Sequence, residues 1–294
     1  MMKEKTNSGE EMMEKTVIKI NRLISKIFLF FPYPGVNFLR KKICKSLAPK
    51  INEEVFCPTI YKTIMKVNPS NSGLEKNIYY YGEYEDGTIS FLEKNLKRGD
   101  IFLDVGANIG LMSCSMSKKI GEKGKIYAIE PEIKNFNKLK ENIKINNINN
   151  IHVHKIALSS NEGESILYGD KGEASLIDYN NELKREKVKL TTMDIFLKNK
   201  EIPNAIKIDV EGYELEVLKG GIETLKEHGP VLCIEVSHLH PQKGSISEMF
   251  ALLKKLNYKI FKLKKGKTIR SKLIEITREG ELPFHDNIFC IVKN

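Results

Sequence analysis

Short apolar segments that favour β-strands alternate with helix-length segments through most of the chain after residue 100. Strands are predicted at 101–105, 125–129, 151–156, 188–190, 205–209, 231–235, 258–263 and 287–292. Helices with one apolar face are predicted at 111–120, 133–145, 215–225 and 246–256. Strands that alternate with helices of about 10–15 residues form parallel sheets covered on both faces. The sequence therefore predicts an α/β fold with a doubly wound, mostly parallel sheet.

A glycine-rich turn follows the first of these strands and precedes a helix. It contains Asp104, Gly106, Ala107, Asn108 and Gly110. Glycines at such a place let the backbone turn tightly and approach a ligand closely. The next strand ends at Glu130, where a carboxylate can accept two hydrogen bonds from a ribose diol. The pattern predicts an adenosyl ligand on this turn, although an ordinary βα turn with an acidic cap is the alternative.

The nature of that ligand follows from two residues of the turn. A dinucleotide fingerprint needs glycine two positions after the first glycine, and Asn108 stands there instead. Asp104, just before the turn, repels a pyrophosphate and attracts a cation. S-adenosylmethionine carries a sulfonium, an ammonium and a ribose but no phosphate, and it is therefore the predicted cofactor.

Two sequence motifs carry a resemblance to a known family. The turn at 104–110 together with Glu130-Pro131 resembles the cofactor motifs of class I methyltransferases. The segment Lys207-Ile-Asp-Val-Glu-Gly212, followed by Glu214 and Val217-Leu-Lys-Gly220, is similar to the signature of the FkbM family. The segments at 81–85 and 99–100 also resemble that family. The resemblance covers roughly residues 79–240, and the second motif is the more specific of the two.

This resemblance implies a seven-stranded sheet, S-adenosylmethionine as methyl donor and methylation of a hydroxyl, often on a sugar or polyketide-type product. It implies that Asp104, Gly106 and Gly110 line the methionine part of the cofactor. Glu130 then holds the ribose and Ala157 lies near the adenine. Ala107 and Asn108 complete the predicted cofactor-binding set.

Two predicted strand ends carry candidate catalytic residues. Asp209 and Glu211 follow one strand, and Glu235 and His238 end the next. Our hypothesis is that Asp209 or His238 accepts the substrate proton while Glu211 and Glu235 orient it. Alternatively, Asp209 caps the following helix and His238 is structural. Oxygen and imidazole ligands also suit a hard divalent cation, so metal dependence stays open and no metal ligand is assigned.

The N-terminal part differs in composition from the rest. Residues 1–15 are predicted to form a disordered tail, 16–78 a basic amphipathic extension with helix, and 79–294 the methyltransferase domain. Between residues 17 and 47, basic and bulky apolar residues interleave, which is typical of a segment in a membrane interface. A helix packed on the main domain is the alternative. The stretch 51–82 is predicted to be mixed and strand-like, and 170–186 to be a lid or acceptor loop.

Charge and cysteine content bound the remaining choices. The net charge of +10 suggests an anionic partner, so a nucleic-acid methyltransferase is one alternative function. It is disfavoured, because two carboxylates at 209–211 oppose a phosphate backbone. A non-catalytic module that binds S-adenosylmethionine or a membrane is the other. Five cysteines without a paired spacing predict a reducing, cytoplasmic setting. The segment 17–47 adds the prediction of peripheral membrane contact. The predicted acceptor is a glycan or small-molecule hydroxyl.

Overall fold

The computed structural model of the chain describes Ile20, Leu23 and residues 36–169, 175–177, 185–238 and 246–292. These residues belong to two compact units, Met1–Tyr84 and Glu85–Asn294, which we describe separately. The predicted tail at 1–15 and most of the segment 17–47 lie outside the described residues, as does most of 170–186. In the described part of the chain, no helix is both long and apolar enough to cross a membrane.

Between residues 36 and 84, the first unit consists of a helix, a β-hairpin and a second helix. Its elements are α2 (Val36–Leu47), β1 (Val55–Pro58), β2 (Ile64–Val67) and α3 (Gly73–Tyr81). The prediction of strand for 51–82 is wrong for α3, which begins because the hydroxyl of Ser72 accepts a hydrogen bond from the N–H of Glu75. Gly82 ends the helix in the left-handed conformation.

The boundary between the units lies after Tyr84, whereas the sequence placed it before Tyr79. A buried ion pair joins the last residues of this unit to its helix α2. The guanidinium of Arg40 donates to Glu83 Oε2 at 2.7 Å and also to Oε1, and both side chains are buried. A charge removed from water needs such a partner, so Glu83 is held in the first unit.

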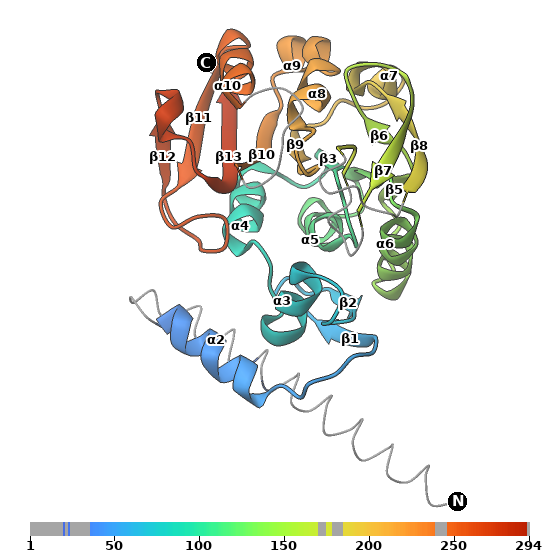
Figure 1. Ribbon diagram of the computed structural model, residues 1–294, viewed down its shortest axis with the longest axis vertical. Helices are drawn as coiled ribbons and strands as arrows, with labels where there is room; N and C mark the ends of the chain where they lie inside the picture. Colours follow the sequence, from blue (N-terminus) through green and yellow to red (C-terminus); the bar gives the residue numbers. More distant parts are fainter. Residues whose placement is uncertain are drawn as a thin grey trace, which may run out of the picture. The chain divides into compact units, whose positions relative to one another are not determined.

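The second unit is built on an eight-stranded sheet of order β12-β11-β13-β10-β9-β3-β4-β5 (Figure 1). Its strands are β3 (Ile101–Val105), β4 (Lys125–Ile129), β5 (Ile151–His154), β9 (Ala205–Ile208), β10 (Val231–Ser237), β11 (Tyr258–Leu263), β12 (Leu273–Ile276) and β13 (His285–Val292). The five strands from β10 to β5 are parallel, and β13 is antiparallel to both β10 and β11. The predicted mostly parallel α/β sheet is confirmed. It has one strand more than the implied seven, because β12 pairs with β11 at the edge.

Helices cover both faces of this sheet. They are α4 (Asp86–Asn95), α5 (Leu111–Ile120), α6 (Ile133–Ile145), α7 (Met193–Leu197), α8 (Glu214–Lys219), α9 (Ile222–His228) and α10 (Ile246–Lys255). Figure 1 shows α4, α5 and α6 on one side of the sheet and α8, α9 and α10 on the other. Together they enclose a core in which strand residues such as Leu103, Ile206 and Ile234 are fully buried.

The helix predicted over 215–225 is two helices, α8 and α9. Two glycines separate them at a place where the chain packs too closely for side chains. A Cβ on Gly220 would lie 1.9 Å from the carbonyl oxygen of Ser159, and one on Gly221 would lie 2.7 Å from the sulfur of Met193. The break therefore follows from packing against the strand β6 (Ala157–Leu158) and α7.

A second, three-stranded sheet lies in the same unit and has the order β6-β8-β7. Strand β8 (Arg185–Thr191) is longer than the predicted 188–190, and β7 (Gly163–Tyr168) was not predicted. Leu167 and Val188 bury their side chains with Ala157 in the core of this sheet.

Candidate functional site

The glycine turn links the end of β3 to the start of α5, and its glycines are required by the protein itself. Gly106 and Gly110 have φ of 82° and 89°, which non-glycine residues rarely adopt. A Cβ on Gly106 would lie 1.9 Å from the carbonyl oxygen of Asp209, and one on Gly110 would lie 2.3 Å from Leu139 Cδ1. The turn therefore packs directly against the end of β9 and against α6.

All five backbone N–H groups of this turn are used within the protein. Those of Gly106 and Ala107 donate to the carbonyl of Ile129, and that of Gly110 donates to the carbonyl of Ala107. The N–H of Asn108 donates to Glu130 Oε2 at 2.7 Å, and the next N–H donates to Asn108 Oδ1. A phosphate-binding turn points such groups at its ligand, so this one is suited to a ligand without phosphate.

Glu130 follows β4 and is buried beside this turn. Its Oε1 accepts from the N–H of Glu132 at 3.0 Å, and its Oε2 accepts from Asn108. Burial is the main cause that raises the pKa of Glu130, to about 8, and the two backbone N–H donors oppose it. Each carboxylate oxygen has two lone pairs, so both can still accept a hydroxyl donor.

Asp104 lies under the turn in β3 and is fully buried. The hydroxyl of Ser113 donates to its Oδ2 at 2.5 Å. Within the described residues, Oδ1 has no hydrogen-bond partner. Burial raises the pKa of this carboxyl group, and Lys207 opposes the shift. An acceptor left without a donor at full burial is costly, and it marks a place where a cationic group is favoured.

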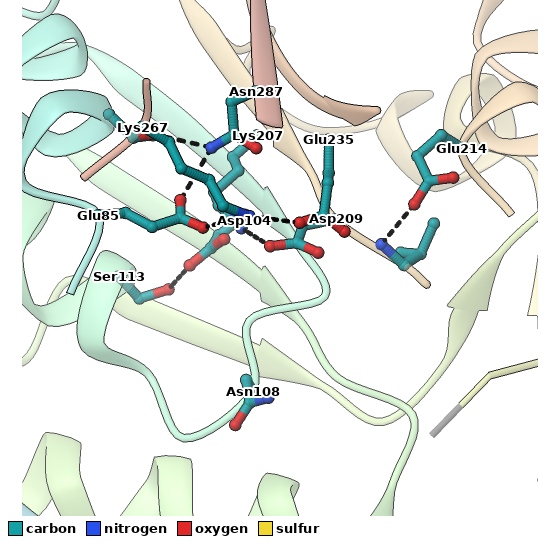
Figure 2. A network of polar contacts seen from close by, with 12 residues as sticks. Glu85, Asp104, Asn108, Ser113, Lys207, Asp209, Glu214, Glu235, Lys267 and Asn287 are labelled. Atoms are coloured by element: carbon teal, nitrogen blue, oxygen red, sulfur yellow. Dashed lines mark hydrogen bonds and ion pairs between the residues drawn. The ribbon is translucent and has the colours of Figure 1, made fainter. Parts of the chain in front are cut away.

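The predicted catalytic carboxylates meet at the carboxyl ends of β9 and β10, in a group that we call the acidic cluster: Glu85, Asp209 and Glu235. One carboxylate oxygen from each lies within 4.8 Å of the others. Two ammonium groups neutralise it. Lys207 Nζ lies 2.6 Å from Asp209 Oδ2, and Lys267 Nζ lies 2.5 Å from Glu235 Oε1 (Figure 2).

The acidic cluster contains carboxyl groups with opposite pKa shifts. Burial is the first cause that raises the pKa of Glu235, to about 8, and the charge of Asp209 adds to it. Burial also acts to raise the pKa of Asp209, but the two lysines outweigh it, so this pKa is lowered. Carboxylates held close together cannot all ionise easily. Burial and the charge of Asp209 thus disfavour ionisation of Glu235, and Asp209 is the more readily ionised of the two.

Asp209 does not cap α8, which was the alternative for this residue. The N-cap residue of α8 is Tyr213, and no side chain accepts a capping hydrogen bond there. Glu214, the first residue of the helix, instead accepts through Oε1 from the N–H groups of Val210 and Gly212, each at 3.1 Å. These bonds close the turn in which Glu211 and Gly212 have φ of 52° and 95°. The carbonyl of Glu211 accepts from the hydroxyl of Ser175 at 2.7 Å, so one described part of the predicted lid contacts this turn.

The other predicted site residues lie apart from this network. His238 is exposed and follows β10. Its ring stacks on Phe284 at 5.5 Å, and its N–H donates to the carbonyl of that residue. Ala157 is buried in the core of the small sheet. Of the four predicted catalytic residues, the structure thus brings Asp209 and Glu235 together.

Three residues that complete the network had no predicted role. Glu85 precedes α4, Lys267 lies between β11 and β12, and Asn287 is in β13. The Nδ2 group of Asn287 donates to Glu85 Oε2 at 2.8 Å, and Lys267 Nζ lies 3.1 Å from Glu85 Oε1. Glu85 belongs to the segment 81–85, which resembles the family but predicted no role for this side chain. No spacing in the sequence connects the other two to the strand ends.

Comparisons with known proteins point to one family. The sequence model described as the Methyltransferase FkbM domain matches residues 104–260. The chain is 32% identical over 149 residues to the hexuronic acid methyltransferase AglP of Haloferax volcanii, which covers 48% of this chain and 58% of that protein. It is 24% identical over 182 residues to methyltransferase 1 of Beauveria bassiana, covering 54% of this chain and 72% of that protein. The chain thus spans a little over half the length of AglP.

A solved structure of methyltransferase FkbM from Methylobacillus flagellatus is 15% identical, with a TM-score of 0.43, over 88% of this chain and 71% of that one. The family match covers more than half of the chain and includes the glycine turn, the acidic strand ends and the sheet from β3 to the start of β11. The resemblance seen in the two sequence motifs is confirmed: this chain belongs to the FkbM family of methyltransferases, which are S-adenosylmethionine-dependent enzymes.

Proposed function

We propose that this enzyme transfers a methyl group from S-adenosylmethionine to a hydroxyl of a sugar, with hexuronic acids as the first acceptors to test. One observation carries the proposal. The carbonyl of Asp209 packs against Gly106. The residue predicted to accept the proton is therefore adjacent to the turn predicted to bind the cofactor. The relative AglP, named a hexuronic acid methyltransferase, supports the choice of acceptor.

The residues around the glycine turn fit S-adenosylmethionine. The amides of the turn are already bonded, which suits a molecule without phosphate. The cofactor's cationic groups match Asp104 Oδ1, which has no hydrogen-bond partner among the residues that the structure describes. Glu130 offers both carboxylate oxygens to a ribose diol beside Asn108. We therefore assign Asp104, Gly106, Ala107, Asn108, Gly110 and Glu130 to the cofactor, and Ala157 to the edge of the adenine site. When bound, the cofactor supplies an electrophilic methyl group on sulfur.

Asp209 is the residue that we assign to the acceptor hydroxyl. It is the most exposed member of the acidic cluster, with 20% of its side chain accessible, against 6% for Glu235. Lys207 keeps it ionised, so it can take the hydroxyl proton as that oxygen attacks. Glu235 orients it, and Glu211 fixes the turn through its backbone. His238 remains a second candidate base at the exposed end of β10.

The test compares Asp209→Asn with the native enzyme on methyl glycosides of hexuronic acids and of the matching neutral sugars. We expect kcat to fall by about 10²–10⁴, the usual contribution of a general base, with unchanged affinity for S-adenosylhomocysteine. Glu223→Gln, an exposed carboxylate on α9, is the matched control. Full turnover in Asp209→Asn, or methylation of neither sugar class, contradicts the proposal.

We also propose that the first unit contacts an anionic membrane surface through α2. Phe38, Leu39 and Leu47 are 73%, 50% and 48% exposed on this helix, and Lys42 and Lys45 are exposed among them. Apolar side chains interleaved with lysines favour the interface of an anionic bilayer.

Sedimentation with vesicles that contain phosphatidylglycerol tests this contact. The double variant with Phe38→Ser and Leu39→Ser should have a vesicle partition coefficient more than about tenfold lower than that of the native protein. The reason is that each apolar side chain buried in the bilayer contributes about 1.5–3 kcal/mol. Phe56→Ser is the control, because Phe56 is 58% exposed but lies on β1. Equal sedimentation of all three proteins argues for a different role of α2.

A further inference from the structure

We propose that the ammonium group of Lys267 serves as the built-in cation of the active site, occupying the position that a divalent metal ion would take among Glu85, Asp209 and Glu235. Lys267 is thus a positioning residue, which holds the two deeper carboxylates and leaves Asp209 facing the acceptor. Its effect on turnover depends on the proposed methyl transfer, but its exclusion of metal ions does not.

The acidic cluster has the dimensions of a cation site. Three carboxylate oxygens within 4.8 Å of one another can surround an ion at the 2.0–2.6 Å distances that magnesium, manganese and calcium prefer. Lys267 Nζ lies 2.5 Å from Glu235 Oε1 and 3.1 Å from Glu85 Oε1, and its charge also lowers the pKa of Asp209. The ammonium therefore pairs directly with two members of the cluster, and an oxygen of the third, Asp209, lies within 4.8 Å of one from each of them. A metal ion cannot share that place, because the two positive charges would repel each other in a buried setting.

The backbone of Lys267 is fixed on both sides, which distinguishes it from a flexible surface lysine. Its N–H donates to Asp286 Oδ1 at 2.8 Å. Its carbonyl accepts from the N–H groups of Gly87 and Thr88, at the start of α4. Gly87 allows this approach, since a Cβ there would lie 2.9 Å from the Lys267 carbonyl oxygen. The side chain, 12% exposed, thus begins from a set position and reaches into the cluster (Figure 2).

Lys207 alone cannot neutralise the carboxyl groups around it. Its Nζ pairs with Asp209, and its charge is balanced by Glu85 and Asp104 as well. Four carboxyl groups thus face two ammonium groups: the buried Glu85, Asp104 and Glu235, and the partly exposed Asp209. Removing the Lys267 ammonium leaves an excess of acid that attracts another cation.

The first experiment measures binding of Mn²⁺ by electron paramagnetic resonance, without any methyl acceptor. The native protein should show no site at the cluster, whereas Lys267→Ala should bind Mn²⁺ at least about tenfold more tightly. Lys265→Met, an exposed lysine of the same loop, is the control and should behave as the native protein does. Binding of S-adenosylhomocysteine and circular dichroism establish that each variant is folded, and Lys267→Gln is measured in parallel.

The second experiment measures turnover on the accepted sugar. Native activity should be unchanged by EDTA. Lys267→Ala should have a much lower kcat than the native enzyme. Added Mn²⁺ or Mg²⁺ should raise the kcat of this variant at least about tenfold, which would not happen if the loss were purely structural.

Two results overturn the proposal. One is binding of Mn²⁺ by the native protein that is lost in Glu235→Gln, and the other is a folded Lys267→Ala that takes up no Mn²⁺. If no sugar is methylated while Lys267→Ala gains the metal site, the proposed acceptor fails and the role of Lys267 stands.

Discussion

Glu214 is a buried carboxyl group whose proton affects the stability of the fold. Burial raises its pKa to about 7 from the usual 4.5. Between these values the folded protein holds a proton that the unfolded chain releases, so the free energy of unfolding falls as pH rises from 4.5 to 7. Glu214→Gln cannot titrate, and its remaining oxygen can still accept from Val210 and Gly212. We expect it to reduce this fall by about 1–3 kcal/mol.

Urea unfolding at pH 5 and at pH 8 measures the effect of Glu214→Gln. The amide replaces Oε2, which has no hydrogen-bond partner among the described residues. The difference in pH slope, rather than the absolute stability, is therefore the diagnostic quantity. Glu223→Gln, exposed on α9, should keep the native slope. Identical slopes in all three proteins mean that Glu214 titrates normally.

Gly106 is the residue at which the turn tolerates substitution least. Its φ of 82° disfavours alanine, and the added Cβ meets backbone, the Asp209 carbonyl at 1.9 Å, which cannot rotate away. Gly106→Ala should lower the free energy of unfolding by at least about 2 kcal/mol and weaken binding of S-adenosylhomocysteine. Gly280→Ala, where nothing lies within 4 Å, should be neutral in both. Thermal unfolding and calorimetry check both, and native-like values for Gly106→Ala refute the close packing of this turn.

The loop between β11 and β12 is the element that completes the site. Arg270 binds both carboxylate oxygens of Asp86, at 2.7 and 2.9 Å, and thereby holds the loop to the start of α4. Arg270→Gln leaves Asp86 buried without its cation, although the N-terminus of α4 offsets part of that loss. We expect about 1–3 kcal/mol less stability and faster hydrogen exchange at Gly87 and Thr88, whose N–H groups bind this loop. Native exchange rates there would show that the loop is held by other contacts.

Elements with regular apolar spacing could be predicted, and those defined by tertiary contacts could not. The helices α5 and α6 have the predicted bounds, because apolar residues recur at helical intervals between clear stops such as Gly121. Helix α4 was missed, since its N-cap Glu85 is left-handed and forms no side-chain cap. The edge strand β12 has three partly or fully exposed residues out of four, so its sequence lacks the apolar run of a buried strand.

The same distinction holds for the site. Asp209 and Glu235 were predicted because parallel strands place their carboxyl ends at one edge of the sheet. Lys267 was not, because its neighbours Lys264 and Lys265 have the same character in the sequence. Only the pairing of β11 with β13, which sets the loop beside β10, distinguishes this lysine from the exposed ones. Asn287 likewise gains its role from the antiparallel register that places it opposite Glu235.

At the scale of the whole molecule, binding of the cofactor should protect the carboxyl ends of the strands of the large sheet and leave their amino ends unchanged. The order of strands reverses between β3 and β9, and ligands of doubly wound sheets bind at the carboxyl ends next to such a point. Near the opposite, amino ends of β3 and β5 there is a hollow of about 450 Å³, lined by polar residues that include Arg98, Lys118 and Asn150. A hollow of that size is large enough for a small ligand, so the position of binding needs a direct measurement.

Hydrogen exchange with saturating S-adenosylhomocysteine distinguishes the two ends of the strands. Protection should rise at 104–111, 129–132 and 207–212, because binding opposes local opening of the segments that it contacts. Exchange at 117–122 and 147–150, which line the hollow, should stay as in the free protein. In Glu130→Ala the protection should be lost at the carboxyl ends without appearing at the amino ends. Protection confined to the hollow would place the cofactor on the wrong side of the sheet for Asp209 and would remove the basis for the proposed methyl transfer.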